Sequence, residues 1–149
     1  MHTRTRATMT IDVHRFVTTA EAQIESSPWG PHEWLSRPGL TDAKELLLVR
    51  VLMPPGRAHQ FHRHPAMEEI IYVISGTAEQ WVDRDKRMLR GGELAHIPRD
   101  VVLGTYNAGD DVLIFLAILS PAVSEGPLLI DVHTAEPWVS LKTPLVFTE

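Results

Sequence analysis

The stretch Gly56–Gly76, GRAHQFHRHPAMEEIIYVISG, places three histidines within six residues and follows them with two glutamates. His62 and His64 stand two positions apart, so on a β-strand their side chains point to the same face, about 7 Å apart along the chain. Pro65 favours a strand end or turn, and the apolar run after it predicts a returning strand. One of the two glutamates would then face the histidine pair, but not both, because neighbours on a strand point to opposite faces.

The wider spacing around these residues resembles the first signature of the cupin superfamily. That signature runs Gly-x5-His-x-His-x4-Glu-x6-Gly, and Gly56, His62, His64, Glu69 and Gly76 occupy all of its fixed positions. The resemblance selects Glu69 rather than the glutamate before it. It implies a metal site in which the two histidines and this glutamate hold the ion.

A second stretch, GELAHIPRDVVLGTYN, resembles the second cupin signature, Gly-x5-Pro-x-Gly-x2-His-x3-Asn. Gly92, Pro98 and Asn107 are in register with it. Asp100 stands where the family has glycine, and Leu103 stands where the family has a fourth metal-binding histidine. The resemblance thus supports the fold fully and the metal site in part.

The missing fourth ligand leaves two interpretations open. His96 would replace it if its side chain pointed into the barrel; otherwise it is a strand histidine bonded to a backbone carbonyl. We expect Leu103 to point toward the metal and to leave one coordination position vacant. Strand parity places Gln60 on the face of His62, where it would line the cavity, and places His59 on the opposite, outer face.

Short apolar runs between prolines and glycines predict β-strands rather than long helices. Their near-regular spacing favours an all-β sandwich or barrel, and the resemblance implies a double-stranded β-helix, the jelly-roll barrel of cupins, with its motif-bearing core at about 45–120. The one helix expected is short, Thr18–Glu25, opened by a capping threonine. Two strands, Ile70–Ile74 and Val112–Leu119, are apolar on both faces and need cover from the terminal segments or from a second subunit.

Two further features near the termini have simpler interpretations. Trp29, His32 and Trp34 fall in a stretch rich in glycine and proline, which would either cover the barrel mouth or, as we expect, pack on the barrel or a partner. His133 has no neighbouring histidine and is read as a surface residue.

Composition limits the classes of protein to consider. The 149 residues suit one domain, 1–149, which can bury roughly 70% of the surface of its unfolded chain. A net charge of −5 without a basic stripe argues against nucleic acid as a partner. The longest apolar run has eight residues, too few to cross a bilayer, and the start lacks a secretory h-region, so we expect a cytoplasmic protein. Without cysteine, disulfides and thiolate chemistry are excluded.

Imidazole and carboxylate ligands suit divalent Fe, Mn, Ni, Zn or Cu, and no soft ligand selects among these metals. Three protein ligands leave positions open, as in the facial triad of oxygen-using iron enzymes and in hydrolytic zinc sites. The first hypothesis is therefore a metal-dependent enzyme acting on a small organic molecule, with dioxygenase-type oxidation as the leading reaction. The alternatives are a ligand-binding or sensor protein without turnover, a metal-dependent isomerase or lyase, and a barrel with a structural metal. A homodimer is expected.

Overall fold

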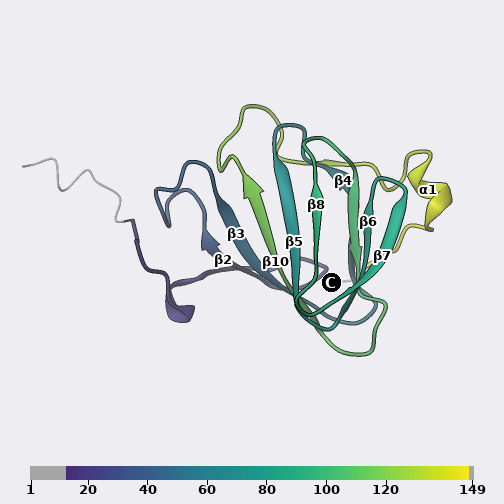
Figure 1. Ribbon diagram of the computed structural model, residues 1–149, viewed down its shortest axis with the longest axis horizontal. Helices are drawn as coiled ribbons and strands as arrows, with labels where there is room; N and C mark the ends of the chain where they lie inside the picture. The colour runs from purple at the N-terminus through teal and green to yellow at the C-terminus, as the bar shows by residue number, and fades with distance from the viewer. Residues whose placement is uncertain (1–12, 148–149) are drawn as a thin grey trace, which may run out of the picture.

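The computed structural model describes residues 13–147 and consists of two antiparallel β-sheets facing each other (Figure 1). The first sheet has six strands, in spatial order β1 (Gln23–Glu25), β2 (His32–Ser36), β3 (Leu47–Met53), β10 (Leu113–Ser120), β5 (Glu68–Ser75) and β8 (Leu94–Ile97). The second sheet has five, in spatial order β11 (Ile130–Asp131), β4 (Ala58–Arg63), β9 (Leu103–Tyr106), β6 (Thr77–Val82) and β7 (Asp85–Arg90). This architecture confirms the predicted all-β jelly-roll class.

The core lies between the two sheets because the central strands of the first sheet alternate with a period of two. Along β3, every second residue from Leu47 to Met53 is buried, and the residues between them are half-buried. Strand β10 shows the same alternation from Leu113 onward, and its register sets Phe115 opposite Val51. The inward side chains of both strands belong to one apolar cluster. Such alternation is what the pleat of a sheet with one buried face requires.

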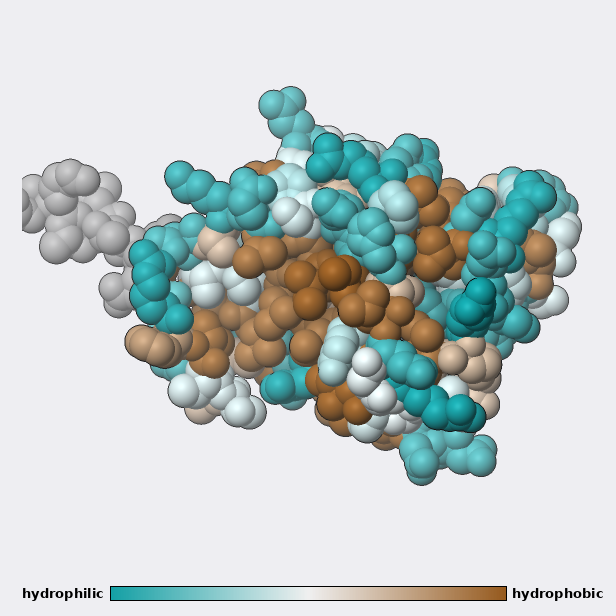
Figure 2. Space-filling view, viewed as in Figure 1, coloured by the Kyte–Doolittle hydropathy of each residue, from teal (hydrophilic) through white to brown (hydrophobic). Residues whose placement is uncertain are grey.

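The outer face of the first sheet stays open to solvent. On β10 and β5 the outward residues, including Leu116, Ile118, Ile70 and Tyr72, are only half-buried, and Ile74 is exposed. Figure 2 shows apolar side chains gathered over β10, β5 and β8 on this side of the molecule. From residue 13 on, the N-terminal part of the chain does not cover this face, because β1 and β2 extend the sheet at its edge instead. The two-sided apolar strands therefore keep one uncovered face.

The last segment covers the outer face of the second sheet. Phe61 and Trp81 meet there edge to face, with ring centroids 5.3 Å apart, and Trp138 packs at 5.3 Å from Phe61. Trp138 opens the short helix α1 (Trp138–Leu141), which lies beside this sheet (Figure 1). Lys142, directly after the helix, donates to the half-buried carboxylate of Glu79 at 2.8 Å. The predicted cover from a terminal segment thus exists, but over the other sheet.

The structure corrects the helix expected at Thr18–Glu25. Only Thr19–Glu21 forms a turn of 3-10 helix, and Gln23–Glu25 form β1 instead. This turn does have a capping contact at Thr18, because the backbone N–H of Thr18 donates to Glu21 Oε1 at 2.8 Å. Pairing of β1 with β2 then outweighs the weak helix preference of so short a segment. Within residues 13–147, no helix has the length and apolar character needed to cross a membrane.

Two turn glycines allow a matched test of backbone packing. Gly56 and Gly76 both adopt a positive φ, +80° and +85°, so alanine at either position carries backbone strain of about 1–2 kcal/mol. A Cβ at Gly76 would lie 2.7 Å from the Val112 carbonyl oxygen, whereas at Gly56 nothing lies within 4 Å. We expect Gly76→Ala to lower the free energy of unfolding by a further ~1–3 kcal/mol, measured by urea denaturation of the metal-free protein. Equal decreases in the free energy of unfolding for Gly56→Ala and Gly76→Ala would contradict the close approach of Gly76 to the Val112 carbonyl.

Candidate metal centre

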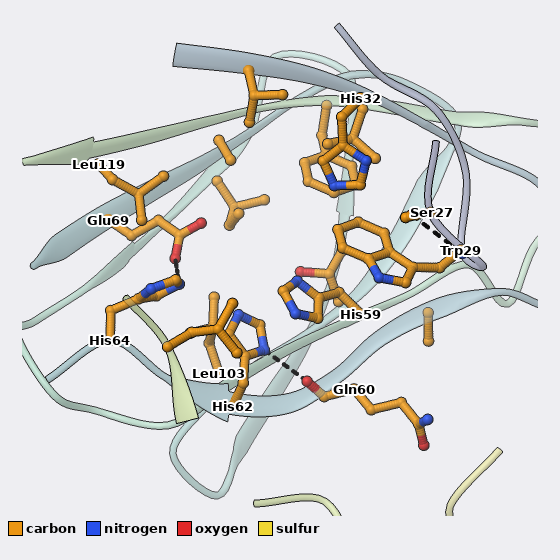
Figure 3. Close-up of a pocket in the computed structure, with 18 of the residues that line it drawn as sticks. Ser27, Trp29, His32, His59, Gln60, His62, His64, Glu69, Leu103 and Leu119 are labelled. Carbon is orange, nitrogen blue, oxygen red and sulfur yellow. Dashed lines mark hydrogen bonds and ion pairs between the residues drawn. The ribbon is translucent and has the colours of Figure 1, made fainter. Parts of the chain in front are cut away.

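Three side chains converge at one end of the space between the sheets. His62 lies near the end of β4, His64 follows that strand, and Glu69 is the second residue of β5. One ligand atom from each lies within 4.8 Å of the other two, and all three residues are buried. Figure 3 shows these side chains pointing into one common space. The structure therefore brings together the three residues that the first signature singled out.

Backbone carbonyls fix the orientation of both imidazoles. His62 Nδ1 lies 2.7 Å from the Gln60 carbonyl oxygen, and His64 Nδ1 lies 2.9 Å from that of Leu128. A carbonyl oxygen only accepts hydrogen bonds, so each Nδ1 carries a proton and donates it. The other ring nitrogen, Nε2, is then the one that faces the cluster. Metal-binding histidines in proteins are held in this way by a partner of the non-coordinating nitrogen.

The carboxylate of Glu69 lacks the partners that a buried anion needs. Its exposed fraction is 5%, and its Oε1 accepts no hydrogen bond, although His64 Nε2 lies 3.2 Å away. A buried charge without compensation is costly, and a cation placed between the three side chains would supply that compensation. The unsatisfied oxygen and the two oriented imidazoles together fit a divalent metal ion.

The surroundings favour different proton states for the two histidines. Burial, together with a positive charge on His64, lowers the pKa of His62 to about 3 despite its bond to the Gln60 carbonyl. His62 is thus neutral, which is the form that binds metals. Burial also lowers the pKa of His64, but Glu69 and the Leu128 carbonyl more than offset it, so this pKa is raised overall. The carboxylate that would bind the ion thus also favours a proton on His64.

The position of the missing fourth ligand is apolar. Leu103 on β9 stands opposite His62 on β4, is fully buried and borders the cavity beside the three ligands. His96 lies elsewhere: its side chain is 52% exposed, and its Nε2 lies 2.8 Å from Glu68 Oε1 on the outer face of the first sheet. The register explains this, because Glu69 pairs with Ile97 and shares the inner face with it, so His96 points outward.

A β-bulge in β4 overturns the face expected for His59. The register with β9 slips between His59 and His62, so that three steps along β4 match two steps from Thr105 to Leu103. In a regular strand, residues three apart point to opposite faces. The extra residue of the bulge removes this alternation, so both histidines point to the same side. Their rings stack with centroids 3.6 Å apart and planes 12° apart. His59 therefore borders the cavity, where burial and the nearby histidines hold its pKa well below its usual value.

Gln60 lines the cavity as expected, but its side chain does not reach the cluster. Its side-chain amide is bound to the backbone of Leu145, at 3.1 Å to the carbonyl oxygen and 2.8 Å from the N–H. Figure 3 shows this side chain pointing away from the ligands. Its contribution to the centre is the carbonyl oxygen that holds His62.

Residues from both ends of the chain complete the cavity. Trp29 stacks on His59 at 4.2 Å, and His32, the first residue of β2, meets Trp29 edge to face at 4.3 Å. His133, read as a surface residue, is half-buried and borders the cavity, which corrects that interpretation. The segment read as a loop, including Trp34, thus contributes a strand and part of the cavity wall. Nothing in the sequence near these residues marks them as neighbours of the histidine cluster.

The cavity that these residues enclose has a volume of about 470 Å³. Its inner wall is formed by apolar side chains of the first sheet: Leu47, Val49, Val51, Ile71, Phe115, Ala117 and Leu119. This volume falls in the range of about 300–1,000 Å³ that small-molecule sites occupy. The three converging ligands therefore lie in the wall of a chamber large enough for an organic molecule.

Comparison with known proteins supports the same assignment of fold. Residues 49–119 match a family model described as a cupin domain. A curated protein named polyketide synthase CurC, from Streptomyces cyaneus, is 29% identical over 126 residues, which are 85% of this chain and 81% of that protein. An RmlC-like cupin from Shewanella frigidimarina has a similar structure, with a TM-score of 0.65 and 21% identity over 75% of this chain and 95% of that one. Oxalate decarboxylase from Lactobacillus farciminis has a TM-score of 0.66 and 20% identity, over 83% of this chain and 36% of that one.

Proposed function

The chain belongs to the cupin superfamily, and we propose that it is an enzyme that acts on a small organic molecule at a divalent metal ion held by His62, His64 and Glu69. One observation carries the proposal: both Nδ1 atoms are committed to carbonyl oxygens, and a buried, unsatisfied Glu69 oxygen lies where the free nitrogens converge. The reaction we favour is dioxygenase-type oxidation.

The donor set accepts Fe, Mn, Ni, Zn or Cu as divalent ions. When bound, such an ion would supply Lewis-acid chemistry and, where it is redox-active, electron transfer at its open positions. The chain itself holds the ligands in place through the carbonyls of Gln60 and Leu128 and surrounds the centre with apolar side chains that limit access of water. In a dioxygenase reaction O2 is the oxidant and both of its atoms enter the organic product, so no further reductant is required.

The cavity favours an enzyme or a ligand-binding protein over a barrel with a structural metal. A structural site is closed by its ligands, whereas this cluster borders a chamber of about 470 Å³. A sensor without turnover, or a metal-dependent isomerase or lyase, would use the same chamber. The curated relative named polyketide synthase CurC suggests polyketide-type compounds as the first molecules to try.

The test is anaerobic loading of the purified protein with each metal, followed by elemental analysis and oxygen-uptake measurements with a compound panel. We expect about one ion per chain and, with the correct compound, O2 consumption equal to product formed, with both atoms of ¹⁸O2 in the product. Product without O2 uptake would indicate an isomerase or lyase, and binding without product would indicate a sensor. A protein that takes up no ion would refute the proposal.

We also propose that residues 1–149 form one domain and that two copies pair through the outer face of the first sheet. Large contiguous apolar patches are uncommon on monomers, and the outward residues of β10 and β5 form an apolar surface on the first sheet (Figure 2). A cytoplasmic location stays a prediction that cell fractionation can test.

Sedimentation velocity tests the dimer at micromolar concentration. Leu116 lies at the middle of the patch, opposite Tyr72 and Arg50 on the neighbouring strands, so Leu116→Glu is expected to convert the dimer to monomer. Met88→Glu is the matched control, because Met88 is an exposed apolar residue of β7 on the other sheet. A wild-type protein that sediments only as a monomer would count against this interface.

A further inference from the structure

Apart from histidines, the described part of the cavity wall carries no basic side chain. Among the residues of 13–147 that border the cavity there is neither lysine nor arginine. Two exposed carboxylates, Glu25 and Asp131, border it in addition to the ligand Glu69. Sites that recognise small carboxylate or phosphate groups usually present arginine or lysine to them. The chamber wall thus offers a small anion neither lysine nor arginine, and Arg57 lies outside this lining, with its guanidinium hydrogen-bonded to the Pro28 carbonyl and 5.1 Å from the Phe147 ring.

The remaining wall is apolar on one side and aromatic on the other. Beside the aliphatic side chains of the first sheet lie the rings of Trp29, His32 and His59, and Trp29 contacts both histidines (Figure 3). Phe115 and Phe147 also border the chamber. Burying an apolar molecule against such a wall is favourable by about 25 cal/mol per Å² of its surface, whereas a charged molecule would lose its hydration here without compensation.

A few polar atoms remain that suit an uncharged ligand. His133 Nδ1 is buried and has no hydrogen-bond partner in the part of the chain that the structure describes. A neutral imidazole nitrogen pairs well with a hydroxyl or carbonyl group. Leu103 adds to this by leaving a coordination position vacant, so that an ion with three protein ligands has room for two ligand atoms from one molecule beside a further small molecule.

We propose that the substrate of this site is an uncharged, largely apolar aromatic molecule that approaches the ion through two adjacent oxygen atoms, and that small carboxylate anions are disfavoured. This inference rests on the proposed function, since it uses the metal as one of the binding groups. It goes further in naming the chemical class of the substrate.

The test uses two probes that both chelate through two oxygen atoms: 2,3-dihydroxynaphthalene, an uncharged aromatic diol, and oxalate, a small dianion. The protein is loaded with Zn²⁺, which has no redox chemistry and so does not consume the diol. Free metal is removed by gel filtration, and the Kd of each probe is then measured by titration calorimetry. The zinc content of the protein is determined before and after the titration. We expect the diol to bind at least about tenfold more tightly than oxalate, and to bind more weakly when zinc is removed.

Four variants distinguish the contribution of the cavity wall from that of the metal ion. Trp29→Ala is expected to weaken diol binding by about two- to tenfold with unchanged zinc content, and Trp29→Phe to restore most of it. Phe16→Ala is the control, because Phe16 is an aromatic residue that is 85% exposed and does not border the cavity, and it should leave binding unchanged. Leu128→Arg adds a cation at an exposed position of the cavity wall and should tighten oxalate binding by about two- to fivefold.

The outcomes distinguish this inference from the proposed function. Oxalate binding as tightly as the diol, with one zinc ion per chain, would overturn the substrate class and leave the metal site intact. Equal diol binding with and without zinc would overturn chelation by adjacent oxygens. A protein that binds no zinc would overturn the proposed function itself.

Discussion

Alanine in place of His62, His64 or Glu69 is expected to strip the metal from the protein. Each of these substitutions removes one of three protein ligands, whereas loss of an outer partner already costs about 10–100-fold in metal affinity. The metal content measured by elemental analysis after dialysis should therefore fall from about one ion per chain to near zero in all three variants. Circular dichroism of each variant establishes that the loss of metal is not a loss of fold.

Neighbouring residues of the same type provide the controls. Glu68 and His96 form an ion pair on the outer face, so Glu68→Ala and His96→Ala remove a glutamate and a histidine without touching the cluster. Both control variants should keep about one ion per chain. The site would lie elsewhere if the metal content stayed at about one ion per chain in all three variants, His62→Ala, His64→Ala and Glu69→Ala.

Leu103→His is expected to tighten metal binding by at least about tenfold, because it restores a fourth imidazole where the position is now apolar. Leu103 stands directly opposite His62 on the neighbouring strand and is fully buried at the cluster, so a histidine there would face the same ion. Competition with a chelator of known affinity measures the change. Leu103→Phe adds a ring of comparable size without a nitrogen ligand and should not tighten binding.

The same measurement on His96→Ala decides between the two interpretations of the missing ligand. With His96 on the outer face, its removal should leave the metal affinity within about twofold of wild type. Release of the ion from His96→Ala, together with no effect of Leu103→His, would mean that His96 swings inward and completes a four-ligand centre.

The sequence was sufficient to predict the parts of the site that lie close together along the chain. His62, His64 and Glu69 are separated by one tight turn between two strands. Strand parity predicted that the two histidines share a face and that one glutamate faces them, and the resemblance to the first signature selected Glu69. The orientation of Leu103 followed from its position in the second signature.

Two kinds of feature escaped prediction, each for a physical reason. The bulge in β4 inserts one residue without any glycine or proline to mark it, and it reverses the face of His59. Trp29, Leu128 and His133 reach the cluster from segments far away in the sequence, and a periodic pattern contains no information about such long-range contacts.

The Leu128 carbonyl makes occupancy of the centre depend on chain continuity well beyond the motif. Leu128 lies after β10 and outside residues 49–119, yet it orients His64. Two residues further on, Ile130 of β11 pairs with Arg63 of β4, and this pairing anchors the tether. A chain that ended before β11 would leave His64 free to rotate. Anyone transplanting this centre into another scaffold must therefore carry the tether along with the two signatures.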